Sequence, residues 1–204
     1  MDIRKFKAFY LFNGVEFLPP GSVLITDQQG TITDITDEKN AGDNIETFEG
    51  IITPGFINTH CHLELSHMKG KIPVNTGLIE FLTRVIKERN FEADEITSAM
   101  IQAAQEMYQS GIVAVGDICN TSDSLRVKKN TNINWHNFIE VIGFNGKDAP
   151  ARINYANTIL QDFRSNVPRN ASDSYFYTSF APHSPYRLKR RSTSPISGPT
   201  SVRS

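Results

Sequence analysis

The first 50 residues consist of short segments in which apolar and polar positions alternate, separated by turn residues. This alternation is the period of a half-buried β-strand, and it predicts three strands, at residues 5–12, 22–26 and 31–35. Asn13-Gly14, directly after the first of them, is a dipeptide typical of hairpin turns. Residues 37–46 are polar and predict a loop. A meander of this size is too thin to hold much of a core, so we expect it to pack on another part of the protein.

After residue 50, segments with the hydrophobic period of a strand alternate with segments that have the hydrophobic period of a helix. Apolar residues recur at i, i+3, i+4 and i+7 in three segments, which predicts amphipathic helices at residues 78–86, 95–110 and 153–163. Gly111 should end the second helix. The continuous apolar run at residues 112–116 is typical of a strand buried on both faces, and further strands are predicted at residues 56–62, 133–143 and 174–181. Strands that alternate with helices indicate a parallel α/β sheet.

Polar residues gather directly after the carboxyl ends of these strands, namely His60, His62, Glu64, Asp117 and His183. In a (β/α)₈ barrel this end carries the active site, and a doubly wound sheet binds its ligand in a similar position. The chain has no G-x-G-x-x-G or P-loop motif, which disfavours the nucleotide-binding sheet. A barrel takes roughly 250 residues. Only about four strands can be placed between Gly50 and Tyr186 of this sequence. The sequence therefore predicts half a barrel with two open edges.

Composition places the chain among ordinary globular proteins, because 39% of its 204 residues are hydrophobic and the net charge is −1. This balance gives no reason to expect nucleic acid or an anionic membrane as a partner. Two cysteines, Cys61 and Cys119, are too few for a disulfide framework. We find no signal peptide and no apolar run of the ~20 residues that span a bilayer. The expectation is a protein of the cytoplasm.

The last 18 residues, 187–204, differ from the rest in composition. They hold five of the 21 basic residues and no acid, so 16 basic and 22 acidic residues remain in the body, a charge of −6. The segment is rich in Ser, Arg and Pro and predicts disorder. One interpretation is a functional basic tail around Lys189-Arg190-Arg191 that serves nuclear localisation or nucleic-acid binding. The other is a break in the reading frame or a truncation after Tyr186, which we favour because the change falls inside a motif and not at a domain boundary.

The candidate chemistry is centred on His60-Cys61-His62. If residues 56–62 form a strand, both histidines point to one face, about 7 Å apart along it. Neutral imidazoles at that spacing can both reach one divalent ion, whereas Cys61 points the other way. The alternative is a pair of ordinary histidines on a strand. An apolar strand that leads directly into the pair, after Pro54-Gly55, favours the metal site.

The segment PGFINTHCHLELS, residues 54–66, resembles the first barrel strand of the amidohydrolase superfamily. It is most similar to the branch that holds cytosine deaminase, chlorohydrolases, S-adenosylhomocysteine deaminase and aminofutalosine deaminase. A second match, APHSPY at residues 181–186, follows in the right order and at a plausible distance. The resemblance implies half of a small composite β-sandwich at residues 1–50 and the N-terminal half of a metal-dependent hydrolase barrel at residues 51–186, followed by the tail at 187–204.

The resemblance also implies roles for individual residues. His60 and His62 match the first two metal ligands, with zinc as the expected ion and iron as the alternative. His183 matches a histidine that faces the substrate, and its alternative role is to cap a strand end. Glu64 would touch substrate, orient the histidine pair, or be a plain loop carboxylate. The family's third ligand, its His-x-x-Glu acid/base and its late aspartate have no counterpart, because no His, Asp or Glu follows Tyr186.

The function implied for the intact form is hydrolytic deamination of an amino-substituted heterocycle by metal-bound hydroxide. This chain has no catalytic acid/base and is expected to be inactive alone, with a small molecule as the substrate and a homodimer left open. Asp117 is expected to be structural, and Glu140, inside an apolar strand, should either pair or face the barrel interior. Two other classes compete: a non-enzymatic α/β binding module with a basic tail, and an amidase or imidase that uses a carboxylated lysine.

Overall fold

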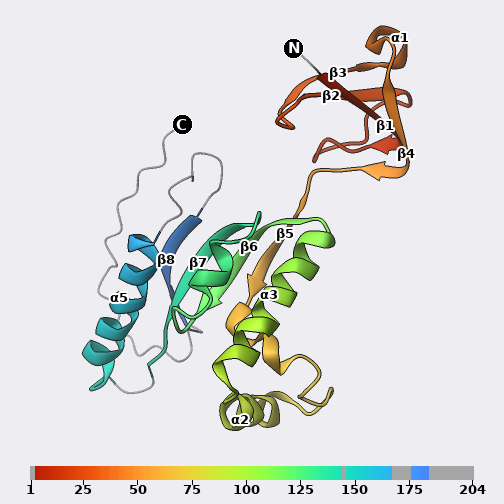
Figure 1. Ribbon diagram of the computed structural model, residues 1–204. Coiled ribbons are helices and arrows are strands. Elements are labelled where there is room, and N and C mark those ends of the chain that lie inside the picture. The colour runs from red at the N-terminus through yellow and green to blue at the C-terminus, as the bar shows by residue number, and fades with distance from the viewer. Residues whose placement is uncertain (1–2, 144–145, 167–175, 184–204) are drawn as a thin grey trace. The chain divides into compact units, whose positions relative to one another are not determined.

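The computed structural model describes residues 3–143, 146–166 and 176–183 (Figure 1). They fall into two compact units, which divide between Gly55 and Phe56. The basic segment 187–204 and the end of the APHSPY motif, residues 184–186, lie outside the described residues. No helix within the described ranges is long and apolar enough to cross a membrane.

The first unit is a four-stranded sheet in the order β3-β2-β1-β4. Its elements are β1 (Ile3–Leu11), β2 (Ser22–Asp27), β3 (Ile32–Asp37), α1 (Glu38–Ala41) and β4 (Ile45–Ile52). The three predicted strands are confirmed, and Asn13 and Gly14 lie in the turn closed by a bridge between Phe12 and Phe17. Val23, Ile25 and Ala41 form a buried cluster with Ile45 packed against it, which is a small core for a sheet of four strands.

The loop predicted for residues 37–46 is wrong in part, because a helical turn and the start of a strand lie there. Asp37 begins α1 by accepting a hydrogen bond from the Asn40 amide at 3.0 Å, a local capping contact. β4 forms by pairing parallel to β1, with Lys5 opposite Ile45. Such pairing joins residues forty positions apart, and the polar composition of this segment does not indicate it.

The second unit is a parallel sheet in the order β5-β6-β7-β8, as predicted. Its strands are β5 (Phe56–Cys61), β6 (Ile112–Cys119), β7 (Asn134–Val141) and β8 (Phe176–Pro182). Within the described residues β5 and β8 each have one neighbour, so both edges of the sheet are open. The expectation that residues 112–116 are buried on both faces is wrong for the start of β6, because Val113 is exposed and full burial begins at Val115.

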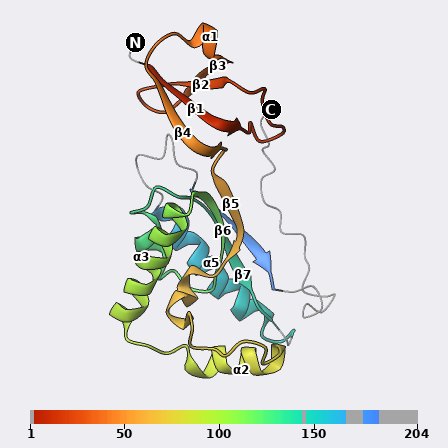
Figure 2. The same ribbon diagram turned by 90° about the vertical axis from the view of Figure 1, so that its right-hand side faces the viewer.

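The three predicted helices are confirmed as α2 (Leu78–Glu88), α3 (Ala93–Gln109) and α5 (Ala149–Ser165), and two short ones were not predicted: η1 (Leu63–Met68) and α4 (Leu125–Lys128). α3 packs on η1, α4 and β6, whereas α5 packs on β7 and β8 (Figures 1 and 2). Gly111 ends α3 as predicted, and its φ of 82° is left-handed backbone that favours glycine.

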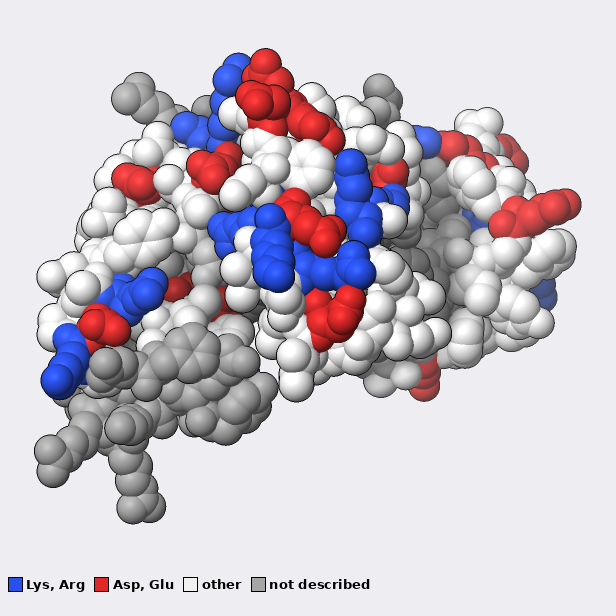
Figure 3. All heavy atoms as spheres, turned by 90° about the horizontal axis from the view of Figure 1, so that it is seen from below, with Lys and Arg blue, Asp and Glu red and all other residues white. Residues whose placement is uncertain are grey.

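One core cluster joins α3, η1 and the sheet around Leu63, Met100, Val115 and Trp135. A second lies under α5 around Ile139, Leu160 and Phe163. α2 differs, because its apolar face buries no residue and Ile79 is 83% exposed. Basic and acidic side chains are interspersed on the face drawn in Figure 3, in keeping with surface pairs such as Lys69–Glu106 at 2.7 Å.

Candidate active site

The end of β5 lies unusually close to β6, and Gly116 is the reason. A Cβ at Gly116 would lie 2.9 Å from the Thr59 carbonyl oxygen and 3.0 Å from the Phe138 ring. Real Cβ atoms do not approach backbone this closely, so only glycine leaves the space. The pairing of β5 with β6 is irregular between Asn58 and Cys61, at the same level. Gly116 in β6 therefore determines the path of the backbone at Thr59, directly before His60.

His60 and His62 bring their rings together at the carboxyl end of β5. The ring centroids lie 5.2 Å apart with planes at 73°. β5 ends at Cys61, one residue earlier than the predicted strand, and His62 begins the turn into η1. The two rings nevertheless converge, close enough for both to reach one ion. Their role as metal ligands remains a prediction.

The chemistry of His62 suits a metal ligand. Burial lowers the pKa of its imidazole, and the neighbouring His60 lowers it further, so the neutral form that binds metals is favoured. Its Nδ1 is buried and has no hydrogen-bond partner among the described residues. Those residues contain no group of three His, Cys, Asp or Glu side chains placed to hold an ion. The two histidines can serve as two ligands of a divalent ion. The remaining ligands that such an ion needs are not among the described residues.

Cys61 does not join the pair. Its side chain packs against the core cluster that contains Leu63, Met100 and Trp135. Burial raises the pKa of its thiol to about 12, and the nearby Asp117 carboxylate adds to the rise. A protonated thiol in the core is a poor ligand.

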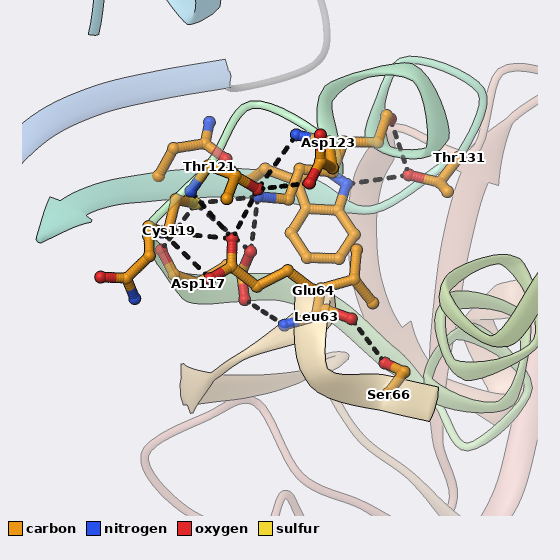
Figure 4. Close-up of polar contacts among 12 residues, drawn as sticks. Leu63, Glu64, Ser66, Asp117, Cys119, Thr121, Asp123 and Thr131 are labelled. Atoms are coloured by element: carbon orange, nitrogen blue, oxygen red, sulfur yellow. Dashed lines mark hydrogen bonds and ion pairs between the residues drawn. The ribbon is translucent and has the colours of Figure 1, made fainter. Parts of the chain in front are cut away.

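Behind the pair lies a buried polar cluster on β6, α4 and β7 (Figure 4). Asp117 accepts a hydrogen bond from the Leu63 amide at 2.7 Å through Oδ1 and pairs with the Lys128 ammonium at 2.5 Å through Oδ2. Lys128 also donates to Asn137 Oδ1 at 2.7 Å. Burial lowers the pKa of Lys128, but Asp117 and Cys119 raise it more, so the net shift is upward. The expected structural role of Asp117 agrees with these contacts.

Glu64 lies at the start of η1 and holds the loop after β6. Its carboxylate accepts hydrogen bonds from the amides of Asn120, at 3.2 Å, and Thr121, at 3.1 Å, and from the Thr121 hydroxyl at 3.0 Å (Figure 4). Only 7% of Glu64 is exposed, and burial raises the pKa of its carboxyl against these hydrogen bonds. Glu64 is therefore a buried carboxylate that holds the loop after β6, and contact with substrate or orientation of the histidine pair remains a prediction.

Glu140 and His183 meet at the carboxyl ends of β7 and β8. Glu140 Oε1 contacts His183 Nδ1, and Glu140 Oε2 accepts a hydrogen bond from the Asn120 side chain at 3.0 Å. The expectation that Glu140 pairs is therefore confirmed. Both residues influence the pKa of His62, and the histidine pair, Glu140 and His183 all come from the carboxyl ends of the strands β5, β7 and β8.

Sequence reasoning missed Asn120, Thr121 and Lys128. Asn120 and Thr121 contribute backbone amides, which carry no residue-type signal, and side-chain donors of types that normally face solvent. A lysine in a short polar stretch normally faces solvent, so nothing local marked Lys128. The available signal was Asp117, because an acid inside a buried strand needs a partner of opposite charge.

Comparison with known proteins identifies relatives of this chain. The sequence model of the amidohydrolase family matches residues 51–190. An aminodeoxyfutalosine deaminase from a Nitratiruptor species is 30% identical over 139 residues, 68% of this chain and 33% of the relative. A 5'-deoxyadenosine deaminase from Methanococcoides burtonii is 28% identical over 109 residues, 51% of this chain and 24% of the relative. The chain thus spans about a third or less of the curated relatives that it matches.

Solved structures show the same fold. Helicobacter pylori aminofutalosine deaminase superposes with a TM-score of 0.67 at 20% identity, covering 94% of this chain and 45% of that one. An atrazine chlorohydrolase from Arthrobacter aurescens in complex with zinc gives 0.63 at 14% identity, with 91% and 48% covered. The fold is therefore part of an amidohydrolase-type (β/α)₈ barrel preceded by a small β unit. The chain belongs to the amidohydrolase family.

Proposed function

We propose that this chain supplies the first half of a deaminase site, in which His60 and His62 hold one divalent ion, with zinc expected. The observation that carries the proposal is the convergence of the two rings at the end of the first strand of an amidohydrolase sheet. A bound ion of this kind activates water for attack on a carbon that bears an amino group. The contribution of His62 is to offer a neutral nitrogen at physiological pH, because burial disfavours its charged form.

The substrate that we infer is an amino-substituted heterocycle, of the purine-nucleoside kind. The support is the pair of relatives above, both deaminases in name. His183 would meet this substrate from the end of β8. Glu140 contacts His183 Nδ1, which leaves Nε2 as the nitrogen free to face a ring atom.

We also propose that these 204 residues alone do not catalyse the reaction. A carboxylate that moves protons between water and leaving group is required, and the family's His-x-x-Glu segment has no match after residue 186. Glu64 cannot easily take that role, since its oxygens are occupied by the loop after β6. Two protein ligands also leave an ion largely water-coordinated, so affinity should be weak.

The test is zinc binding by the purified chain, followed by competition with a chromophoric chelator. We expect weak binding that is lost in His60→Ala/His62→Ala and kept in His136→Gln, a control histidine on β7. Ammonia release from 5'-deoxyadenosine in the presence of zinc is expected to stay at background. Zinc binding unaffected by loss of both histidines would refute the metal site, and chelator-sensitive turnover would refute the inactivity.

A further inference from the structure

We propose that Asp117 is a positioning residue for the histidine pair: its carboxylate fixes the backbone directly after His62, and Lys128 fixes the carboxylate. The inference rests on the proposed metal site and adds residues that touch neither the ion nor substrate.

The Leu63 amide stands at the start of η1. The first amides of a helix have no partner within it. His62, at the preceding position, provides no side-chain cap. Asp117 Oδ1, from the neighbouring strand, accepts this hydrogen bond at 2.7 Å, and both Asp117 and Leu63 are fully buried. The carboxylate therefore ties β6 to the residue after His62.

Lys128 sets the orientation of the Asp117 carboxylate. Its other oxygen pairs with Lys128 Nζ at 2.5 Å, and neither side chain is exposed. Lys128 is itself held by Asn137 Oδ1 at 2.7 Å, and its ammonium lies 5.2 Å from the centroid of the Trp135 ring. Both oxygens of Asp117 thus have fixed partners. Buried ion pairs add little net stability on average, because desolvation offsets the attraction, so geometric specification is the better account of this one.

The orientation of the His62 ring depends on its backbone. A metal-binding histidine is usually oriented by a hydrogen bond from its second nitrogen. Among the described residues neither ring nitrogen of His62 makes a hydrogen bond, and Nδ1 is buried, so no such bond to them fixes the ring. Its direction follows from the His62 backbone, and the Asp117–Leu63 bond is what fixes that backbone on its carboxyl side.

Two double variants separate the hydrogen-bond acceptor from the charge. Asp117→Asn/Lys128→Met keeps an oxygen for the Leu63 amide, while Asp117→Leu/Lys128→Met removes it, and neither leaves a lone buried charge. Asp123→Asn, at an exposed carboxylate in the loop after β6, is the control. The readouts are the zinc dissociation constant, exchange of the Leu63 amide by NMR, and urea unfolding to confirm the folded fraction.

We expect the asparagine variant to keep the zinc constant within about twofold, and the leucine variant to weaken it about tenfold or more while its Leu63 amide exchanges faster. Equal zinc constants in two folded double variants would overturn the inference. If the leucine variant does not fold, loss of zinc affinity in the asparagine variant with Leu63 still protected would also overturn it. Zinc binding by the unsubstituted chain that does not depend on His60 refutes the proposed site itself.

Discussion

At the residue scale, His62 and Cys61 are neighbours in the chain, and burial moves their pKa values in opposite directions. The imidazole of His62 is pushed toward its neutral form, and the thiol of Cys61 is held protonated with a pKa of about 12. Both shifts follow from burial, which disfavours the charged form of each group. The result is a neutral imidazole at His62 beside a protonated thiol at Cys61, an arrangement that favours nitrogen over sulfur as the ligand.

The lowered pKa of His62 predicts a pH dependence with a defined sign. Because the folded state resists protonation, the stability from neutral His62 is present above the unfolded value of about 6.5 and is lost as pH falls through the lowered folded pKa. The His62 ring should titrate by NMR with a midpoint below about 6.5.

Burial also lowers the pKa of His136, which contributes with the same sign. Comparison of the unsubstituted chain with His62→Gln therefore isolates the part due to His62. The difference in unfolding free energy between the unsubstituted chain and His62→Gln should shrink as the pH falls. A ring midpoint at or above the usual histidine value would contradict the prediction.

Gly116→Ala tests the close approach of β5 to β6. The added methyl would meet the Thr59 carbonyl at 2.9 Å, so the strand that carries His60 must shift. We expect a loss of about 1–3 kcal/mol in the free energy of unfolding, measured with urea. Gly143→Ala is the matched control, since a Cβ there meets nothing within 4 Å and no left-handed backbone is involved. Equal effects of the two substitutions would mean that Gly116 is not required for the approach.

At the scale of elements, the sequence predicted the pieces that local periodicity determines. The helices at 78–86, 95–110 and 153–163 and the strands of the parallel sheet are present because each has a strong apolar pattern of its own. β4, η1 and α4 were missed because they are short or polar and form through distant contacts, such as the Asp117 bond to the start of η1. In the candidate site, the histidines could be predicted from the sequence, whereas the contacts that hold them could not.

Glu64→Gln tests how η1 holds the loop after β6. Glutamine keeps one carbonyl oxygen and brings an amide donor to a place where the loop already donates. We expect a loss of about 1–3 kcal/mol in unfolding free energy, because buried donors lose an acceptor. Amide exchange at Asn120 and Thr121 should accelerate more than elsewhere. Glu80→Gln, on the surface of α2, is the control and should leave both amides unchanged.

At the scale of the molecule, the second unit is a sheet whose two edge strands lack an outer neighbour within the described residues. β5 also presents apolar side chains outward, with Phe56 60% and Ile57 66% exposed. Unpaired strand edges with exposed apolar residues are templates for association. The family relationship accounts for this surface, since matched structures are about twice as long as the part this chain covers. We therefore expect the purified chain to self-associate.

A charge on β5 should weaken that association, because lysine on an edge strand must lose its hydration when a second strand pairs there. We expect Ile57→Lys to shift sedimentation velocity profiles toward the monomer over a tenfold range of concentration. Val15→Lys is the matched control, since Val15 is more exposed, at 87%, and lies in the first unit. If Val15→Lys disperses the chain as well as Ile57→Lys does, general solubility and not the β5 edge governs association. If the unsubstituted chain is monomeric throughout, the open edges do not pair in solution, and a homodimer built on them is excluded.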